Sequence, residues 1–114
     1  MSFAKQLLDR FNAERKTIEV PEWGEGEGSP FIIYYSPLKA SELDRVQRKH
    51  PGFMQEISMA GVAEVIIMKA EDKDGNKLFT LEDKKFLLDH PPFFLSRLGG
   101  MLMTAESVEE KEKN

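Results

Sequence analysis

A long segment rich in apolar side chains, from about Phe53 to Glu71, constrains the fold of this chain more than any other. Apolar residues recur along it at the three- and four-residue spacing of a helix face. They are Met54, Ile57, Gly61, Val62, Val65, Ile66 and Met68. Residues 62–68 alone would also suit a strand, because valine and isoleucine are frequent in sheets. The length of the whole segment favours a helix. We therefore expect a long, buried central helix.

The rest of the sequence predicts an α+β fold that is mainly helical. Four to five helices are expected to pack around the central helix, together with an N-terminal two-stranded antiparallel β-ribbon. Phe3, Leu7 and Phe11 mark one face of an opening helix, which Ser2 could cap. The other expected elements are strands at 17–20 and 31–35 and helices at about 39–49, 81–89 and 92–105. We expect one compact domain over 1–105 with a mobile acidic, glycine-rich loop at 21–30, and a disordered charged tail at 106–114.

The segment from Asp72 to Asp83 resembles a calcium loop at first sight. A loop of that kind needs glycine at position 6 and a bidentate glutamate at position 12. Counting from Asp72 places Lys77 and Asp83 there, and counting from Ala70 places Gly75 at position 6 but leaves position 1 without a ligand and Leu81 at position 12. The same residues suit a turn at Asp74-Gly75, followed by a helix that Thr80 caps together with Asp83. We predict the turn and the capped helix, and no metal site.

Composition narrows the possible functions. The 114 residues suit one domain, and the net charge of −4 disfavours nucleic acid as the main partner. Cysteine is absent, and no apolar run approaches the roughly 20 residues of a membrane-spanning helix. The N-terminus lacks the apolar block of a secretory signal. These features predict a protein of the reducing cytoplasm that has no membrane or nucleic-acid partner.

No group of residues has the pattern of a catalytic or cofactor site. His50 and His90 both precede prolines at the predicted ends of helices, where histidine commonly interacts with the helix dipole. The glycines of 24–28 alternate with glutamates, which would repel a phosphate. Basic residues of the second predicted helix are expected to form a solvated face. They are Lys39, Arg45, Arg48 and Lys49. We predict a protein that is not an enzyme and has no cofactor.

The supply of large apolar side chains is high for so short a chain, with six methionines and eight phenylalanines. Methionine is common both at adaptable binding surfaces and in irregular cores. The last predicted helix carries more of these side chains than one buried stripe needs. We expect them to contact a partner, although a filled core with scattered exposure would also account for them. The candidate protein-binding residues are Phe93, Phe94, Leu98, Met101, Leu102 and Met103.

The order of these elements resembles that of the tail assembly chaperones of long, non-contractile-tailed phages and related prophages. The passages closest to that family are YYSPLKASELDRVQ, DGNKLFTLEDKKFLL and the acidic tail, and the resemblance covers nearly the whole chain. One departure is the long GEGEGSP loop, which matches no functional feature of the family. The motifs of the family are not catalytic signatures, so they transfer no active-site residue to this chain.

The resemblance implies a function in virus assembly in the host cytoplasm. Such chaperones bind the tape measure protein, keep it soluble, help to recruit tail tube subunits and are absent from the finished virion. A longer, frameshifted form contacts the tail tube protein, and this chain would be the short form. We also expect weak self-association into oligomers. Two alternatives stay open, namely a structural tail or head-completion component retained in the virion, and an ion-binding regulatory module at Asp72–Asn76.

Overall fold

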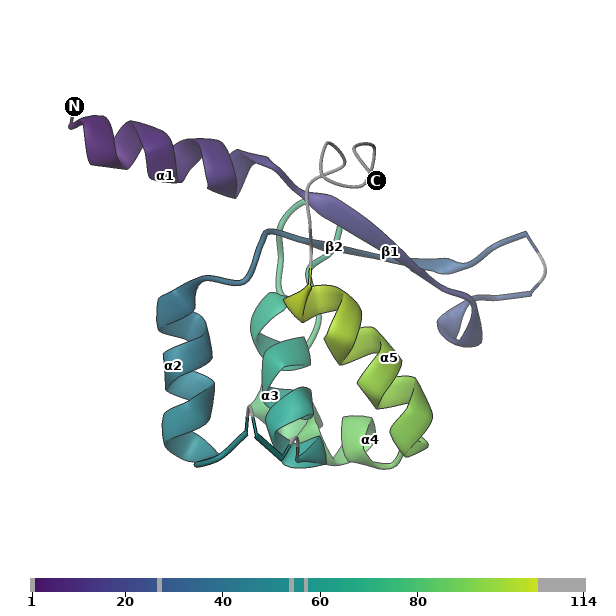
Figure 1. The fold of residues 1–114 in the computed structure, drawn as a ribbon. Helices are drawn as coiled ribbons and strands as arrows, with labels where there is room; N and C mark the ends of the chain where they lie inside the picture. Colours follow the sequence, from purple (N-terminus) through teal and green to yellow (C-terminus); the bar gives the residue numbers. More distant parts are fainter. Residues whose placement is uncertain (1, 27, 54, 57, 105–114) are drawn as a thin grey trace, which may run out of the picture.

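The computed structural model describes residues 2–26, 28–53, 55–56 and 58–104. Its fold is α+β and mainly helical, as the sequence predicts (Figure 1). The α-helices are α1 (Phe3–Ala13), α2 (Ala40–Lys49), α3 (Met59–Lys69), α4 (Lys84–Leu88) and α5 (Pro92–Met103). The strands are β1 (Lys16–Val20) and β2 (Phe31–Tyr35), and short 3-10 helices form at η1 (Pro21–Trp23) and η2 (Leu81–Asp83).

The two strands form the predicted antiparallel ribbon, with Lys16 opposite Tyr35 and Val20 opposite Phe31. Alternate residues of each strand face the helices, as the two-residue period of a strand requires, and the core-facing ones are Ile18, Val20, Ile33 and Tyr35. The segment after α3 is bound to the free edge of β2, because Glu71 exchanges two backbone hydrogen bonds with Tyr34 at 2.8 and 2.9 Å. The ribbon, marginal by itself, is therefore held by the helical part.

Helix α3 is the buried centre of the molecule, but it is shorter than predicted. It begins at Met59 and not near Phe53, because the Ser58 hydroxyl caps it by accepting a hydrogen bond from Gly61 N at 3.1 Å. Phe53 lies in the turn after α2, and its ring is buried against Gly61. Met54 and Ile57, which the prediction placed on the helix, lie outside the described residues. The helical interpretation of 62–68 is confirmed.

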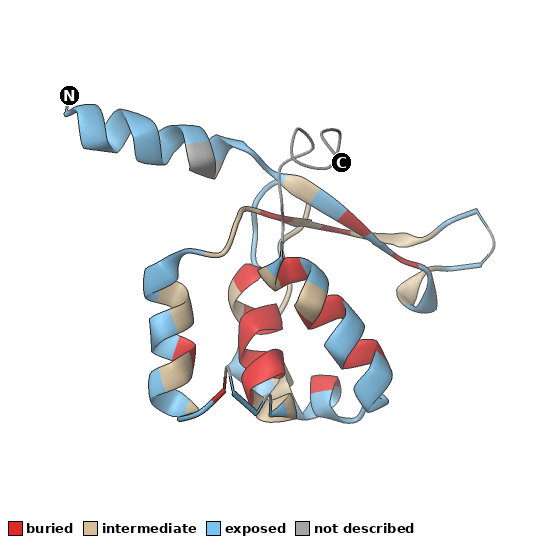
Figure 2. Cartoon of the chain, in the orientation of Figure 1, coloured by how far each residue is buried: buried red, intermediate tan, exposed pale blue. Residues whose placement is uncertain are grey.

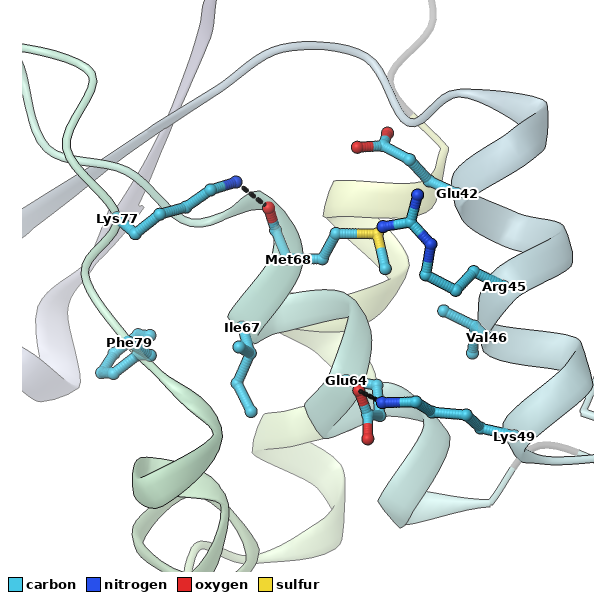
Figure 3. A pocket seen from close by; sticks show the side chains of 9 residues that line it. All are labelled: Glu42, Arg45, Val46, Lys49, Glu64, Ile67, Met68, Lys77 and Phe79. Carbon is cyan, nitrogen blue, oxygen red and sulfur yellow. Dashed lines mark hydrogen bonds and ion pairs between the residues drawn. The ribbon is translucent and has the colours of Figure 1, made fainter.

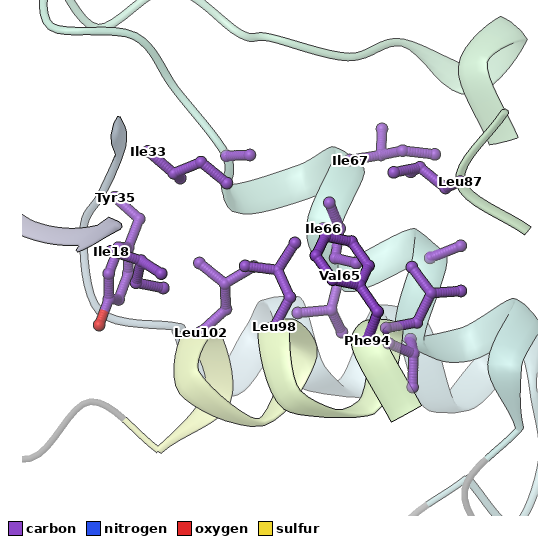
Figure 4. Close-up of a cluster of buried hydrophobic side chains, with 14 of the residues drawn as sticks. Ile18, Ile33, Tyr35, Val65, Ile66, Ile67, Leu87, Phe94, Leu98 and Leu102 are labelled. Atoms are coloured by element: carbon purple, nitrogen blue, oxygen red, sulfur yellow. The ribbon is translucent and has the colours of Figure 1, made fainter. Parts of the chain in front are cut away.

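The hydrophobic core lies between α3, α5, the ribbon and α4 (Figure 4). Helix α5 contributes Phe94, Leu95, Leu98 and Leu102, which recur at helical spacing on the side that faces α3. Gly99 allows the two helices to approach closely, since a Cβ at that position would lie 2.6 Å from Cγ1 of Val62. The core is thus built around the α3–α5 contact.

Helix α1 stands apart from this packed body (Figure 1). Figure 2 colours its described residues as exposed, and the compact body of the described chain begins at β1. Ser2 caps the helix as predicted, with its hydroxyl 3.1 Å from Lys5 N. Just after α1, Arg15 donates hydrogen bonds to the carbonyls of Asp72 and Lys73 at 2.8 and 2.9 Å. The expected disordered tail at 106–114 lies outside the described residues.

The segment from Asp72 to Asp83 forms the predicted turn and capped helix. The Asp72 carboxylate accepts hydrogen bonds from the backbone N–H groups of Asp74 and Asn76 at 2.8 and 2.9 Å, and Gly75 has a φ of +89°. These bonds, led by the one from Asn76, hold the pKa of Asp72 below its usual value. Thr80 caps η2 and forms a capping box with Asp83, whose carboxylate accepts from Thr80 N at 2.8 Å.

Candidate protein-binding surfaces

Helix α5 carries the six residues that the sequence analysis proposed as a binding surface, and the structure separates them. Phe94, Leu98 and Leu102 are buried in the core, so the prediction is wrong for these three. They share the three- and four-residue spacing that places a helix stripe against its neighbour, here α3. Met103 is half-buried against the core. Of the six, only Phe93 (70% exposed) and Met101 (41%) count as exposed side chains.

Helix α1 offers a second apolar surface. Phe3 is 73% exposed, and Leu7 and Leu8 are 38% and 48% exposed. The sequence identified the apolar face of this helix but did not indicate that the face would lie outside the core. Lys5 and Asp9, which lie one helical turn apart, also form a solvent-exposed ion pair at 3.3 Å. A helix whose apolar side chains Phe3, Leu7 and Leu8 are exposed has the form of an element that packs on another polypeptide.

Trp23 joins the acidic loop to the helices, and the sequence analysis did not single it out. Its indole N–H donates to Nε2 of His90 at 2.9 Å, while Nδ1 of His90 lies 3.0 Å from the carbonyl of Phe86. His90 therefore accepts on Nε2 and donates from Nδ1 to the end of α4, which agrees with its predicted place at a helix terminus. Aromatic rings surround the indole, with centroids 5.2–6.2 Å away: Phe31, Phe79, Phe86, His90 and Phe94.

A charged contact strengthens the same connection between the loop and α5. The Glu22 carboxylate and the Arg97 guanidinium lie 2.6 Å apart, and this hydrogen bond is the main reason why the pKa of Glu22 is lowered. The start of the loop is therefore bound to the helices by both an aromatic cluster and an ion pair. Trp23 and His90 are far apart in the sequence, so no local pattern could have indicated their contact.

A groove of about 370 Å³ runs along α3, between α2 and residues 77–79 (Figure 3). Its apolar lining consists of Val46 from α2, Ile67 and Met68 from α3, and Phe79. Charged side chains border this lining, and Figure 3 shows those of α2 directed toward α3. The sequence analysis named two of the cations, Arg45 and Lys49, as part of a solvated face. The structure places both of them at the groove.

The two carboxylates of the groove are already paired with lysines. Glu64, which is 7% exposed, lies 3.2 Å from Nζ of Lys84 and 3.7 Å from Nζ of Lys49. It also lies 3.9 Å from Nε2 of His50, the C-cap residue of α2. A buried carboxylate needs such partners, because transferring an unpaired charge from water into the protein interior costs roughly several kcal/mol.

Glu42 at the other end of the groove pairs with Lys69, whose side chain is only 4% exposed, at 3.0 Å. Burial raises the pKa of Glu42, but hydrogen bonds from Lys39 N and from the Lys69 ammonium outweigh that effect and leave the pKa below its usual value. Lys69 also lies 3.4 Å from the Ser36 hydroxyl. This pair therefore fixes the start of α2 against the end of α3.

Comparisons with known protein families, with characterised proteins and with solved structures gave no match. Over the described residues, no helix has the length and apolar character needed to cross a bilayer. In the same part of the chain, no three side chains of the metal-ligating types converge on one point. The described surfaces are thus apolar or mixed in character, and the strongest candidates for function are α1, the exposed residues of α5 and the α2–α3 groove.

Proposed function

We propose that this protein is a tail assembly chaperone of a long, non-contractile-tailed phage or prophage, and not an enzyme. In the host cytoplasm it binds the tape measure protein, keeps that protein soluble and helps to recruit tail tube subunits. It leaves before the virion is complete. The proposal begins from the resemblance of two passages, YYSPLKASELDRVQ and DGNKLFTLEDKKFLL, to that family.

The exposed apolar face of α1 is the single observation that carries the proposal. A tape measure protein is long and mostly helical, and its apolar faces are open to water until the tube encloses them. The face of α1 that bears Phe3 and Leu7 can pack against such a helix, because two amphipathic helices bury their apolar stripes together. Because α1 extends from the packed body, it can bind without disturbing the core.

The charge of the chain suits the same function. The net charge of −4 would add solubilising charge to the covered helix with each bound copy. Binding of several copies along one long partner raises the apparent affinity when neighbouring copies also touch. Weak contacts between copies are part of the proposal, and they would be heterologous if α1 of one copy met a different surface of the next.

Co-purification tests the proposal directly. The chain, expressed with the tape measure protein of the same genome, should bring that protein through an affinity step, and the complex should persist in moderate salt because the contact is apolar. Mass spectrometry of purified virions distinguishes the alternative of a structural component. A chaperone should be missing from the particle, whereas detection at a stoichiometric level would contradict the proposal.

A further inference from the structure

The α2–α3 groove combines an apolar lining with an excess of cations. Arg45, Lys49 and Lys77 line it beside the side chains of Val46, Ile67, Met68 and Phe79. Within the described part of the chain, no carboxylate oxygen lies within 4.0 Å of the Arg45 guanidinium. Lys49 and Lys77 are each about half exposed. The Lys49 ammonium lies 3.7 Å from the Glu64 carboxylate, and the Lys77 ammonium lies 3.9 Å from the Glu71 carboxylate.

The carboxylates of the groove offset these cations only in part, because Glu64 is shared between Lys49 and Lys84 and Glu42 is paired with Lys69. Glu42 is paired with the buried Lys69, and Glu64 is hydrogen-bonded to Lys84, which lies outside the lining. The groove is therefore positive at its border although the whole chain has a net charge of −4. Local reversal of the overall charge favours a partner of opposite sign at this place and disfavours a second copy of the acidic chain.

We propose that this groove binds a short acidic, apolar segment of the partner polypeptide. One or two of its large apolar side chains would lie against Ile67, Met68 and Phe79, and its carboxylates would pair with Arg45 and Lys77. This site is separate from the apolar face of α1. It would therefore give the chaperone a second contact, one that is selective for negatively charged segments of the partner. The identity of the partner as the tape measure protein rests on the proposed function, but the chemistry of the groove does not.

The test uses two synthetic peptides, the acidic EELLEELLEELL and its basic counterpart KKLLKKLLKKLL, titrated into the full chain labelled with ¹⁵N. The acidic peptide should shift the amide signals of Arg45, Met68 and Lys77 in a saturable way, and binding should weaken as salt is raised. The basic peptide should leave these signals unchanged. Arg45→Glu should weaken binding of the acidic peptide about tenfold, which corresponds to the loss of one partly desolvated charge pair.

Arg48→Glu is the matched control, because Arg48 is exposed on the same helix, carries the same charge and does not line the groove. It should change the affinity less than about twofold.

Equal losses in the two variants, equal binding of both peptides, or shifts confined to α1 would overturn the inference. Groove signals that change on dilution would assign the groove to a second copy, and signals that change on removal of residues 105–114 would assign it to the chain's own C-terminal segment. Either result also overturns it. Failure of this titration leaves the co-purification result untouched, so the two proposals fail separately.

Discussion

At the scale of single residues, neighbouring glycines of α5 have opposite structural roles. A Cβ at Gly99 would lie 2.6 Å from Cγ1 of Val62, whereas a Cβ at Gly100 would meet nothing within 4 Å. Neither glycine has a positive φ, so alanine fits the helical backbone at both positions. From the sequence alone, both glycines only weaken the helix. The contact with Val62 shows why one of them is needed.

The two alanine substitutions should therefore change stability in opposite directions. Gly100→Ala should raise the free energy of unfolding by up to about 1 kcal/mol, because alanine has the better helix propensity. Gly99→Ala should lower it by about 1 kcal/mol, since overpacking against α3 outweighs the same gain. Urea denaturation of the two variants measures both effects, and a stabilised Gly99→Ala would contradict the close approach of α3 and α5.

The Glu42–Lys69 pair should contribute to stability in a pH-dependent way. Because the pKa of Glu42 is lowered in the folded state, its contribution is present above the ordinary carboxyl pKa of about 4.3 and is lost as the pH falls through the lower folded value. Glu42→Gln should reduce the free energy of unfolding by about 2 kcal/mol at pH 7, because it leaves the buried Lys69 without a counter-charge.

The difference between Glu42→Gln and the unchanged protein should shrink as the pH is lowered from 5 toward 3. Glu82→Gln is the control, since Glu82 is exposed in η2 and should change stability by less than about 0.5 kcal/mol. Denaturation curves at several pH values measure the trend. A difference that stays constant down to pH 3 would show that the charge of Glu42 does not act as described.

At the scale of elements, local patterns predicted the strands and α-helices better than their ends or their surroundings, and they missed the 3-10 helix at Pro21–Trp23, which lies in the expected loop at 21–30. The ribbon, α2 and α5 follow from period and from the prolines and glycines that bound them. The start of α3 was missed, because apolar spacing continues through residues 53–58 while the cap at Ser58 begins the helix later. The helical period also shows that α5 has an apolar stripe. It does not show whether that stripe faces α3 or a partner protein. That ambiguity explains why Phe94, Leu98 and Leu102 were assigned to a binding surface.

The cap at Thr80 provides a test at this scale. Thr80→Ala should lower the free energy of unfolding by about 1 kcal/mol, because the hydroxyl accepts a hydrogen bond from Glu82 N at 3.3 Å and starts the η2–α4 segment. Thr80→Ser keeps the hydroxyl and should stay within about 0.5 kcal/mol of the unchanged protein. Thermal denaturation followed by circular dichroism gives both values, and equal losses in the two variants would argue against a capping role.

At the scale of the whole molecule, the chain combines a packed body with one helix outside it. Buried side chains hold α3 and α5 together in the body, and the hydrogen bond between Trp23 and His90 binds the start of the 21–30 loop to it. Helix α1 contributes little to this packing and keeps Phe3 and Leu7 in solvent. The side chains that stabilise the body are therefore different from those that we propose to bind a partner, so the apolar face of α1 can change with little effect on the fold.

The most direct test of the central claim is the fraction of the tape measure protein that stays soluble when it is expressed with this chain. Phe3→Ser combined with Leu7→Ser should lower the soluble fraction severalfold while changing the free energy of unfolding of the chain by less than about 0.5 kcal/mol. Gln6→Ser, an exposed change on the same helix, is the control and should keep the full effect. The account predicts a soluble partner with the unchanged chain and with Gln6→Ser, and an aggregated one with the double variant. Equal solubility with all three chains, or an insoluble partner with the unchanged chain, would contradict it.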